Sequence, residues 1–276
     1  MRTLPFVKMH GLGNDFVVVD RRGAAVPLFP DDARRLGDRH RGVGFDQLVL
    51  IGADDRADAR LVFLNPDGGE AGACGNGTRC AASFLMDEAG VDRVRLATAG
   101  GLLPARRLGD GRVEVAMAPP RLDWGGVPLA EPLDTLHLDL GCGLPPAVAV
   151  GMGNPHAVLF AGDPDALDVA GLGARLERHP LFPERANIGF AHVLGPDRLR
   201  LRVFERGAGL TLACGSGACA ALVAAVRRGL IRGRATLVLD GGELEVAWPG
   251  EGPVVMTGPA SFVFRGSLDL DRLEGG

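Results

Sequence analysis

An internal repeat constrains the fold of this chain more than any other feature of its sequence. Ala73-Cys74-Gly75-Asn76-Gly77 returns as Ala213-Cys214-Gly215-Ser216-Gly217, and Gly11-Leu12-Gly13-Asn14 returns at the same offset as Gly151-Met152-Gly153-Asn154. In this register Gln47 falls opposite Asn187, so small carboxamides occupy equivalent places. Because the three anchors keep their order at an offset close to half of the chain, they indicate a duplicated domain.

Short β-branched or apolar runs bounded by Gly, Pro or Asp predict strands in both halves. These runs span residues 16–19, 47–51, 61–64, 113–117, 157–160, 201–204 and 254–256. Helices are predicted over 30–37, 78–89 and 218–228. Gly90 and Gly229 follow the two longer helices, and each can end a helix in the left-handed conformation.

The helix predicted over 218–228 is apolar on every side from Ala218 to Val226, so it must be buried. Such a helix is easiest to bury if the strands of its half wrap around it. We therefore expect an α/β (α+β) fold of two duplicated, pseudo-symmetric domains, each a curved β-sheet or barrel around a central helix. The active site is expected in the cleft between them. Since Ala118-Pro119-Pro120 offers the best boundary, the predicted domains are 1–118 plus 263–276, with Cys74, and 119–262, with Cys214.

Composition excludes several classes of protein. With 46% hydrophobic and 23% charged residues, the chain is typical of a soluble globular protein and not of a disordered one. A net charge of -4, 5% aromatic residues and no tyrosine argue against a nucleic-acid partner. The longest apolar run, Ala218 to Val226, is too short to cross a membrane, and the first residues lack the apolar stretch of a signal peptide. We therefore expect a cytoplasmic protein without a membrane partner.

Cysteine and lysine usage limits the chemistry further. Five cysteines are an odd number, which argues against a disulfide framework, and the absence of Cys-x-x-Cys and the scattered histidines argue against zinc. Lys8 is the only lysine, so a Schiff base could form only there. We interpret Cys80, Cys142 and Cys219 as small buried hydrophobic residues.

Cys74 and Cys214 differ from these because each precedes a Gly-x-Gly turn that opens a predicted buried helix. Unpaired N–H groups and the helix dipole converge at such a place, which lowers the pKa of a thiol toward neutrality and can also bind a carboxylate. If the halves face each other about a pseudo-twofold axis, two thiols flank one carbon. One can remove a proton from one face while the other delivers a proton to the opposite face, which inverts a stereocentre. The alternative is that both cysteines only fill space in the core.

These residues belong to a set of motifs that resembles the diaminopimelate epimerase family from Lys8 to Ala260. The matching segments are Gly44-Phe45-Asp46-Gln47, Phe63-Leu64-Asn65-Pro66-Asp67-Gly68, Ala73-Cys74-Gly75-Asn76-Gly77-Thr78, Gly153-Asn154-Pro155-His156-Ala157-Val158, Arg185-Ala186-Asn187-Ile188-Gly189-Phe190, Glu205-Arg206-Gly207-Ala208-Gly209 and Ala213-Cys214-Gly215-Ser216-Gly217. The resemblance implies two related α/β domains, with the C-terminal strand returning to the first.

The resemblance also implies an isomerase that needs no cofactor, neither pyridoxal phosphate nor a metal, and is expected to form a homodimer. Its amino-acid substrate would be 2,6-diaminopimelate, converted between the LL and meso forms for lysine and peptidoglycan precursor synthesis. Cys74 and Cys214 would be the two acid/bases. The expected substrate contacts are Asn14, Gln47, Asn65, Asn154, Asn187, Glu205 and Arg206, with backbone donors at Gly75, Asn76, Gly215 and Ser216. His156 has either a supporting role beside these residues or a packing role.

Two departures from the family pattern bear on the substrate. Leu210 stands where a glutamate is expected after Gly209, and Glu70-Ala71-Gly72-Ala73 replaces an acidic residue and methionine before Cys74. The first departure removes a carboxylate near Cys214, which is expected either to ease formation of its thiolate or to alter recognition of a distal ammonium of the substrate.

Three other functions remain open at this stage. One is a racemase of another amino acid on the same fold. Another is a nucleotide-binding oxidoreductase, since Gly215-Ser216-Gly217-Ala218-Cys219-Ala220 fits Gly-x-Gly-x-x-Ala, although the equivalent segment after Cys74 does not. The third is a non-catalytic ligand-binding protein.

Overall fold

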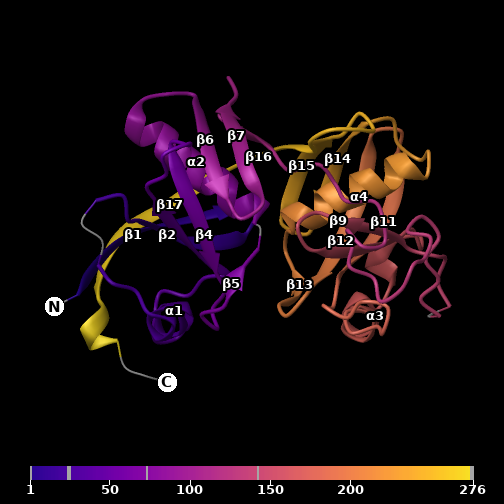
Figure 1. The fold of residues 1–276 in the computed structure, drawn as a ribbon, viewed down its shortest axis with the longest axis horizontal. Coiled ribbons are helices and arrows are strands. Elements are labelled where there is room, and N and C mark those ends of the chain that lie inside the picture. Colours follow the sequence, from indigo (N-terminus) through magenta and orange to yellow (C-terminus); the bar gives the residue numbers. More distant parts are fainter. Residues whose placement is uncertain (1, 24–25, 73, 142, 274–276) are drawn as a thin grey trace. The chain divides into compact units, whose positions relative to one another are not determined.

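The structure is a computed structural model that describes residues 2–23, 26–72, 74–141 and 143–273. Ala73 and Cys142, which the sequence analysis singled out, lie outside the described residues. The chain divides into two compact units, residues 1–115 with 258–276 and residues 116–257 (Figure 1). The sequence predicted the limits 1–118 with 263–276 and 119–262.

The first unit is a mixed sheet with helices on both of its faces. Its elements are β1 Thr3–Gly11, β2 Asn14–Asp20, α1 Pro30–Gly37, β3 Gln47–Gly52, β4 Ala59–Leu64, β5 Glu70–Ala71, α2 Gly75–Ala89, β6 Arg93–Thr98, β7 Gly101–Arg107, β8 Val113–Ala116 and β17 Ser261–Asp269. Strand β2 runs parallel to β3, and β4 runs parallel to β6. The other pairings in this unit are antiparallel: β1–β2, β3–β4, β4–β5, β6–β7 and β7–β8.

The second unit repeats this series of strands and helices. Its elements are β9 Val148–Gly151, β10 Pro155–Leu159, α3 Val169–Leu176, β11 Asn187–Gly195, β12 Arg198–Glu205, β13 Gly209–Thr211, α4 Gly215–Arg227, β14 Arg234–Leu239, β15 Gly242–Ala247 and β16 Val255–Gly258. Here too β10 is parallel to β11 and β12 is parallel to β14, while the remaining pairs are antiparallel. The pairing therefore confirms the duplication that the sequence repeat predicted.

Glycines form the same turns in both units. Gly13 joins β1 to β2 at a φ of 81°, and Gly153 joins β9 to β10 at a φ of 85°. Gly101 and Gly242 open β7 and β15 with φ values of 114° and 133°. Residues other than glycine are strained at these backbone angles. The repeated glycines therefore keep the hairpins of both units alike.

The C-terminal strand β17 belongs to the first unit. It pairs antiparallel with β1 from Thr3 opposite Asp269 to His10 opposite Ser261. The resemblance implied this return of the chain, and the register confirms it.

A central helix packs against most strands of each sheet. Helix α2 contacts β1, β2, β3, β4, β6 and β7, and α4 contacts β9, β10, β11, β12, β14 and β15. The shorter helices cover the other face: Ala33 and Leu36 of α1 pack with Val17 and Leu48, and α3 packs in the equivalent core of the second unit. Because helices cover both faces, strands such as β3 are buried at successive positions and do not alternate between buried and exposed residues.

The structure corrects where the central helices begin. The sequence predicted helices from Thr78 and Ala218, but α2 and α4 start three residues earlier, at Gly75 and Gly215. The glycines after each cysteine are thus the first turn of a helix and not a separate turn. Helix α2 ends at Ala89 as predicted, with Gly90 as its cap at a φ of 65°, and α4 ends at Arg227, one residue before the predicted end, with Gly229 at a φ of 69° after the cap.

We predict that the buried face of α4 carries much of the second unit's stability. Leu222 is fully buried, so Leu222→Ala leaves a cavity and should lower the free energy of unfolding by about 2–5 kcal/mol. Leu230, two residues beyond the helix cap, is 42% exposed and serves as a matched control. Urea denaturation should find little change for Leu230→Ala; equal losses in both variants would contradict the assignment.

Candidate functional site

Each central helix begins at a cysteine that caps its own first turn. Cys74 is the N-cap of α2 and Cys214 is the N-cap of α4, both with extended backbone angles. In each case the Sγ atom accepts a hydrogen bond from the N–H three residues later, Gly77 or Gly217, at 3.3 Å. The two thiols therefore occupy the same local geometry, which the sequence repeat predicted.

A side chain at the third helical position would crowd both the sulfur atom and a residue of the neighbouring strand. A methyl group on Gly77 would lie 3.1 Å from Cys74 Sγ and 2.9 Å from Phe63 Cε1. A methyl group on Gly217 would lie 3.2 Å from Cys214 Sγ and 3.0 Å from Val203 Cγ2. The Cys-Gly-x-Gly spacing thus lets a thiol lie against a helix N-terminus beneath a packed sheet.

The structure corrects the expected pKa of Cys214. A helix N-terminus was expected to lower it, but burial raises it well above the ordinary value, and the charge and hydrogen bond of the Glu205 carboxylate raise it further. The hydrogen bonds from Ser216 and from the Gly217 N–H act in the opposite direction without reversing the result. Cys214 is only 4% exposed, so it is held as a thiol.

Glu205, and not residue 210, places a carboxylate beside Cys214. The side chain of Leu210 is 38% exposed on β13. Thr211 Oγ1 donates to Glu205 Oε1 at 2.5 Å and fixes that carboxylate. Leu210 supplies no carboxylate, but the expected easing of thiolate formation at Cys214 is wrong, because burial and Glu205 raise the pKa of this thiol.

The other described cysteines have different surroundings. Cys80 and Cys219 are fully buried within α2 and α4. Burial raises the pKa of Cys80 to about 12, so it stays protonated. Cys74, in contrast, is partly exposed. Burial in the helix interior agrees with the packing role predicted for Cys80 and Cys219.

Carboxamides from the first unit gather around the start of α2. Asn76 Nδ2 donates to Asn14 Oδ1 at 3.1 Å, and Gln47 Nε2 donates to Asn65 Oδ1 at 3.4 Å. Gln47 is paired in register with Phe16, whose ring edge would lie 3.3 Å from a methyl group on Gly77. Gln47 Oε1 is buried without a hydrogen-bond partner in the described structure, so it can accept one from a ligand.

The second unit arranges its predicted residues around the start of α4. Asn154 Nδ2 lies 3.5 Å from Ser216 Oγ, and Ser216 Oγ lies 3.6 Å from Cys214 Sγ. Asn187, which is 2% exposed, donates to Pro155 O at 3.1 Å and accepts from the backbone N–H of Arg206 at 2.9 Å. The structure thus joins Asn154 and Ser216 to the thiol and links Asn187 to the Arg206 loop.

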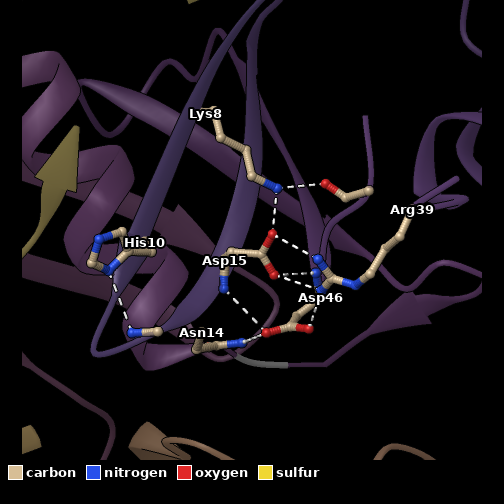
Figure 2. A network of polar contacts seen from close by, with 8 residues as sticks. Lys8, His10, Asn14, Asp15, Arg39 and Asp46 are labelled. Carbon is tan, nitrogen blue, oxygen red and sulfur yellow. Dashed lines mark hydrogen bonds and ion pairs between the residues drawn. The ribbon is translucent and has the colours of Figure 1, made fainter. Parts of the chain in front are cut away.

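Glu177 and Asp46 lie at these two centres but were not predicted as site residues, and His156 was left between a supporting role and a packing role. Glu177, which is 5% exposed, accepts from the Gly207 N–H at 2.9 Å and anchors the loop after Arg206. His156 contacts Asn154, and Asp46 contacts Asn14 (Figure 2). Asp46 lies in the motif Gly44-Phe45-Asp46-Gln47, but the spacing of residues does not indicate which aspartate accepts a hydrogen bond from Asn14.

The described residues contain no group of three or more His, Cys, Asp or Glu side chains placed to hold a metal ion. Across the same described ranges, no helix is both long and apolar enough to span a membrane.

The sequence matches a known family model. The model described as diaminopimelate epimerase matches residues 6–122 and 148–263. The diaminopimelate epimerase of Acidiphilium cryptum is 56% identical over 270 residues, which cover 98% of each chain. That of Rhodospirillum centenum is 54% identical over 273 residues, covering 98% of this chain and 94% of the relative.

Solved structures share the fold at much lower identity. A hydroxyproline epimerase from Agrobacterium vitis has a TM-score of 0.72 at 17% identity, covering 99% of this chain and 94% of that one. A probable proline racemase from Agrobacterium radiobacter has a TM-score of 0.69 at 20% identity, covering 97% and 93%. At this identity the likeness shows the fold alone.

We predict an acid-sensitive stability component from His156. Burial, with a smaller contribution from the positive charge of Arg206, lowers its pKa from 6.5 to about 3. The unfolded chain therefore binds more protons between these values, so the stabilisation is complete above pH 6.5 and is lost as the pH falls toward 3. At pH 5 the loss is about 2 kcal/mol.

Urea denaturation at pH 8 and pH 5 checks this expectation. The difference between the two pH values should be smaller by that amount in His156→Phe. His40 is exposed, and His40→Phe should behave as wild type. An identical pH dependence in wild type and His156→Phe would contradict a neutral buried imidazole.

Proposed function

Because the chain belongs to the diaminopimelate epimerase family, we propose that it is an isomerase that interconverts LL- and meso-2,6-diaminopimelate. The observation that supports this most directly is the pair of cysteine-capped helices. Both thiols accept the N–H of a glycine at 3.3 Å, one in each repeat. A duplicated acid/base site is suited to a reaction that treats the two faces of one carbon alike.

In the proposed reaction, a thiolate removes the proton from Cα and the other cysteine, as a thiol, delivers its proton to the opposite face. The C–H electron pair stays on the substrate and forms the new C–H bond, so nothing is oxidised or reduced. After the step the first sulfur is protonated and the second is a thiolate. Exchange of protons with solvent restores the starting state.

The unequal surroundings of the cysteines support unequal starting roles. Cys214 is buried, and its raised pKa keeps the proton on sulfur. We assign it the role of proton donor in the resting enzyme. Cys74, which is partly exposed, is then the base.

The remaining predicted residues are proposed to hold the substrate. An amino acid offers ammonium donors and carboxylate acceptors, and carboxamides meet both without adding charge. Gln47 Oε1, buried and without a protein donor in the described structure, is suited to an ammonium group. Helix N-termini at Gly75 and Gly215 are suited to a carboxylate. Glu205 and Arg206 complete the proposed set.

The proposal uses no cofactor. The amine of Lys8, the only lysine, contacts the Asp15 carboxylate and the Gly44 carbonyl, so an imine there would break an ion pair. Assembly as a homodimer and a cytoplasmic location stay predictions from the sequence.

The first test combines substitution with isotope labelling. Cys74→Ala and Cys214→Ala should each lower kcat by at least about a hundredfold, because removal and delivery of the proton are both required. In D2O, wild-type product should carry deuterium from the first turnover, while recovered substrate carries far less. Mass spectrometry of both stereoisomers measures the labels.

Matched controls are available in the same helices. Cys80→Ala and Cys219→Ala should retain turnover, because both side chains are buried in helix interiors. Near wild-type epimerisation by Cys74→Ala or Cys214→Ala would refute the two-thiol mechanism. Parallel assays with proline and other amino acids test the proposed substrate independently of the mechanism. Turnover of these amino acids without turnover of diaminopimelate would overturn the proposed substrate.

The second test measures thiol reactivity. Iodoacetamide attacks thiolates, so we expect alkylation at Cys74 at least about ten times faster than at Cys214, whose pKa is raised and whose side chain is buried. Peptide mapping by mass spectrometry over time gives both rates. Cys80 should react only in denaturant. Faster labelling of Cys214 would reverse the assigned acid and base.

A further inference from the structure

Asn14 and Asn154 occupy equivalent positions but have different neighbours. Each follows the Gly-x-Gly hairpin of its unit, with Gly13 and Gly153 at φ values of 81° and 85°. Asn14 opens β2, and Asn154 directly precedes β10. Since both are proposed to hold the substrate, the direction in which each amide points decides whether a ligand meets a donor or an acceptor.

In the first unit, a carboxylate determines the orientation of the amide. Asn14 Nδ2 donates to Asp46 Oδ2 at 2.8 Å (Figure 2). A carboxylate can only accept, so the NH2 group must face Asp46. The carbonyl end of Asn14 then points to the start of α2, where it accepts from Asn76 Nδ2 at 3.1 Å.

Asp46 is itself held in place from several directions. Arg39 donates to Asp46 Oδ1 at 2.7 Å and to Asp15 Oδ1 at 2.7 Å. The backbone N–H of Asp15 donates to Asp46 Oδ2 at 3.1 Å, and the N–H of Asp46 donates to Asp15 Oδ1 at 3.2 Å. Lys8 binds the Asp15 carboxylate from the other side, as Figure 2 shows.

The charges of this group favour the ionised form of Asp15. Burial opposes ionisation of Asp15, but hydrogen bonds from Arg39 and Lys8 outweigh it and lower the pKa of Asp15. The network of Lys8, Asp15, Arg39 and Asp46 therefore holds the Asp46 carboxylate in place as the acceptor for Asn14 Nδ2.

In the second unit the residue equivalent to Asp46 is Ala186, and a histidine contacts the oxygen of the asparagine amide instead. Ala186 precedes Asn187 just as Asp46 precedes Gln47. His156, which is paired with Asn187 as Phe16 is with Gln47, brings Nε2 to 2.8 Å from Asn154 Oδ1. Because Asn154 Oδ1 can only accept, the Nε2 atom 2.8 Å away carries the single N–H of the neutral ring, and the NH2 of Asn154 faces Ser216 Oγ at 3.5 Å.

We propose that Asp46 and His156 are positioning residues that hold the carboxamides of Asn14 and Asn154 in opposite orientations relative to the two cysteine-capped helix starts. The inference rests on the proposed function for its kinetic consequence. Asn14 turns its carbonyl toward α2, whereas Asn154 turns its NH2 toward α4. The duplicated backbone thereby presents two unlike surfaces to a substrate, and neither amide has to be ordered when the substrate binds.

The kinetic experiment uses Asp46→Asn and His156→Phe. Asp46→Asn keeps the shape of the side chain but lets either end of the Asn14 amide face residue 46. His156→Phe introduces the residue type found at the equivalent position of the first unit, Phe16. KM for diaminopimelate should rise about three- to tenfold with kcat within about threefold, as expected for loss of about one hydrogen bond in substrate binding.

Two matched variants separate positioning from general damage. Glu114→Gln removes an ion pair to Arg106 in the same unit without touching a carboxamide, so it should leave KM unchanged. His156→Gln keeps an N–H donor and should recover most of the KM lost in His156→Phe. An unchanged KM in folded Asp46→Asn and His156→Phe, or an equal rise in Glu114→Gln, would overturn the proposal.

A second measurement does not depend on turnover. In 15N-labelled protein, one side-chain proton of Asn14 should resonate downfield and exchange slowly because it binds Asp46, and Asp46→Asn should shift it. Absence of such a proton in the wild-type protein would overturn the positioning role, even if no variant folds. If the wild-type protein does not epimerise diaminopimelate, the proposed function fails, and the amide signal still decides this inference.

Discussion

The hydrogen bond from a glycine N–H to a cysteine sulfur at the start of each central helix is the contact on which the site depends. A buried helix leaves its first N–H groups without helical partners, and burial makes an unmet donor costly. Sulfur is a weak acceptor, but the thiol at the N-cap satisfies Gly77 in one unit and Gly217 in the other at 3.3 Å. The same bond that completes the helix fixes the direction of the sulfur atom.

At the start of α4, burial and a neighbouring charge affect the pKa of the Cys214 thiol more than the helix dipole does. The dipole of α4 favours a thiolate, yet burial and the Glu205 carboxylate raise the pKa of Cys214. Desolvation acts on the charged form over the whole side chain, whereas the dipole contributes through a few N–H groups. An identical backbone can therefore keep one sulfur protonated while leaving the other open to a different role.

The duplication supplies equal backbones, and substitution at a few positions makes the units chemically unlike. Phe16 corresponds to His156, Asp46 to Ala186, and Asn76 to Ser216. The first unit orients its asparagine with a network of charges near the surface, and the second uses a buried neutral histidine. Two units with the same element order thus differ in the chemistry of the side chains at their helix starts.

The sequence by itself determined the duplication, some of the strands and the two central helices, because the repeated glycines and the apolar run from Ala218 to Val226 leave few other ways to bury these residues. It also singled out Cys74 and Cys214, since their spacing to glycine reflects a local contact within four residues. Local contacts of this kind leave a signal in short motifs. Only the tertiary structure decided that the helices start at the glycines, that Glu205 raises the pKa of Cys214, and that Asp46 and His156 hold the two asparagines. Those outcomes depend on burial and on partners brought together by strand register, and neither is written in the spacing of residues along the chain.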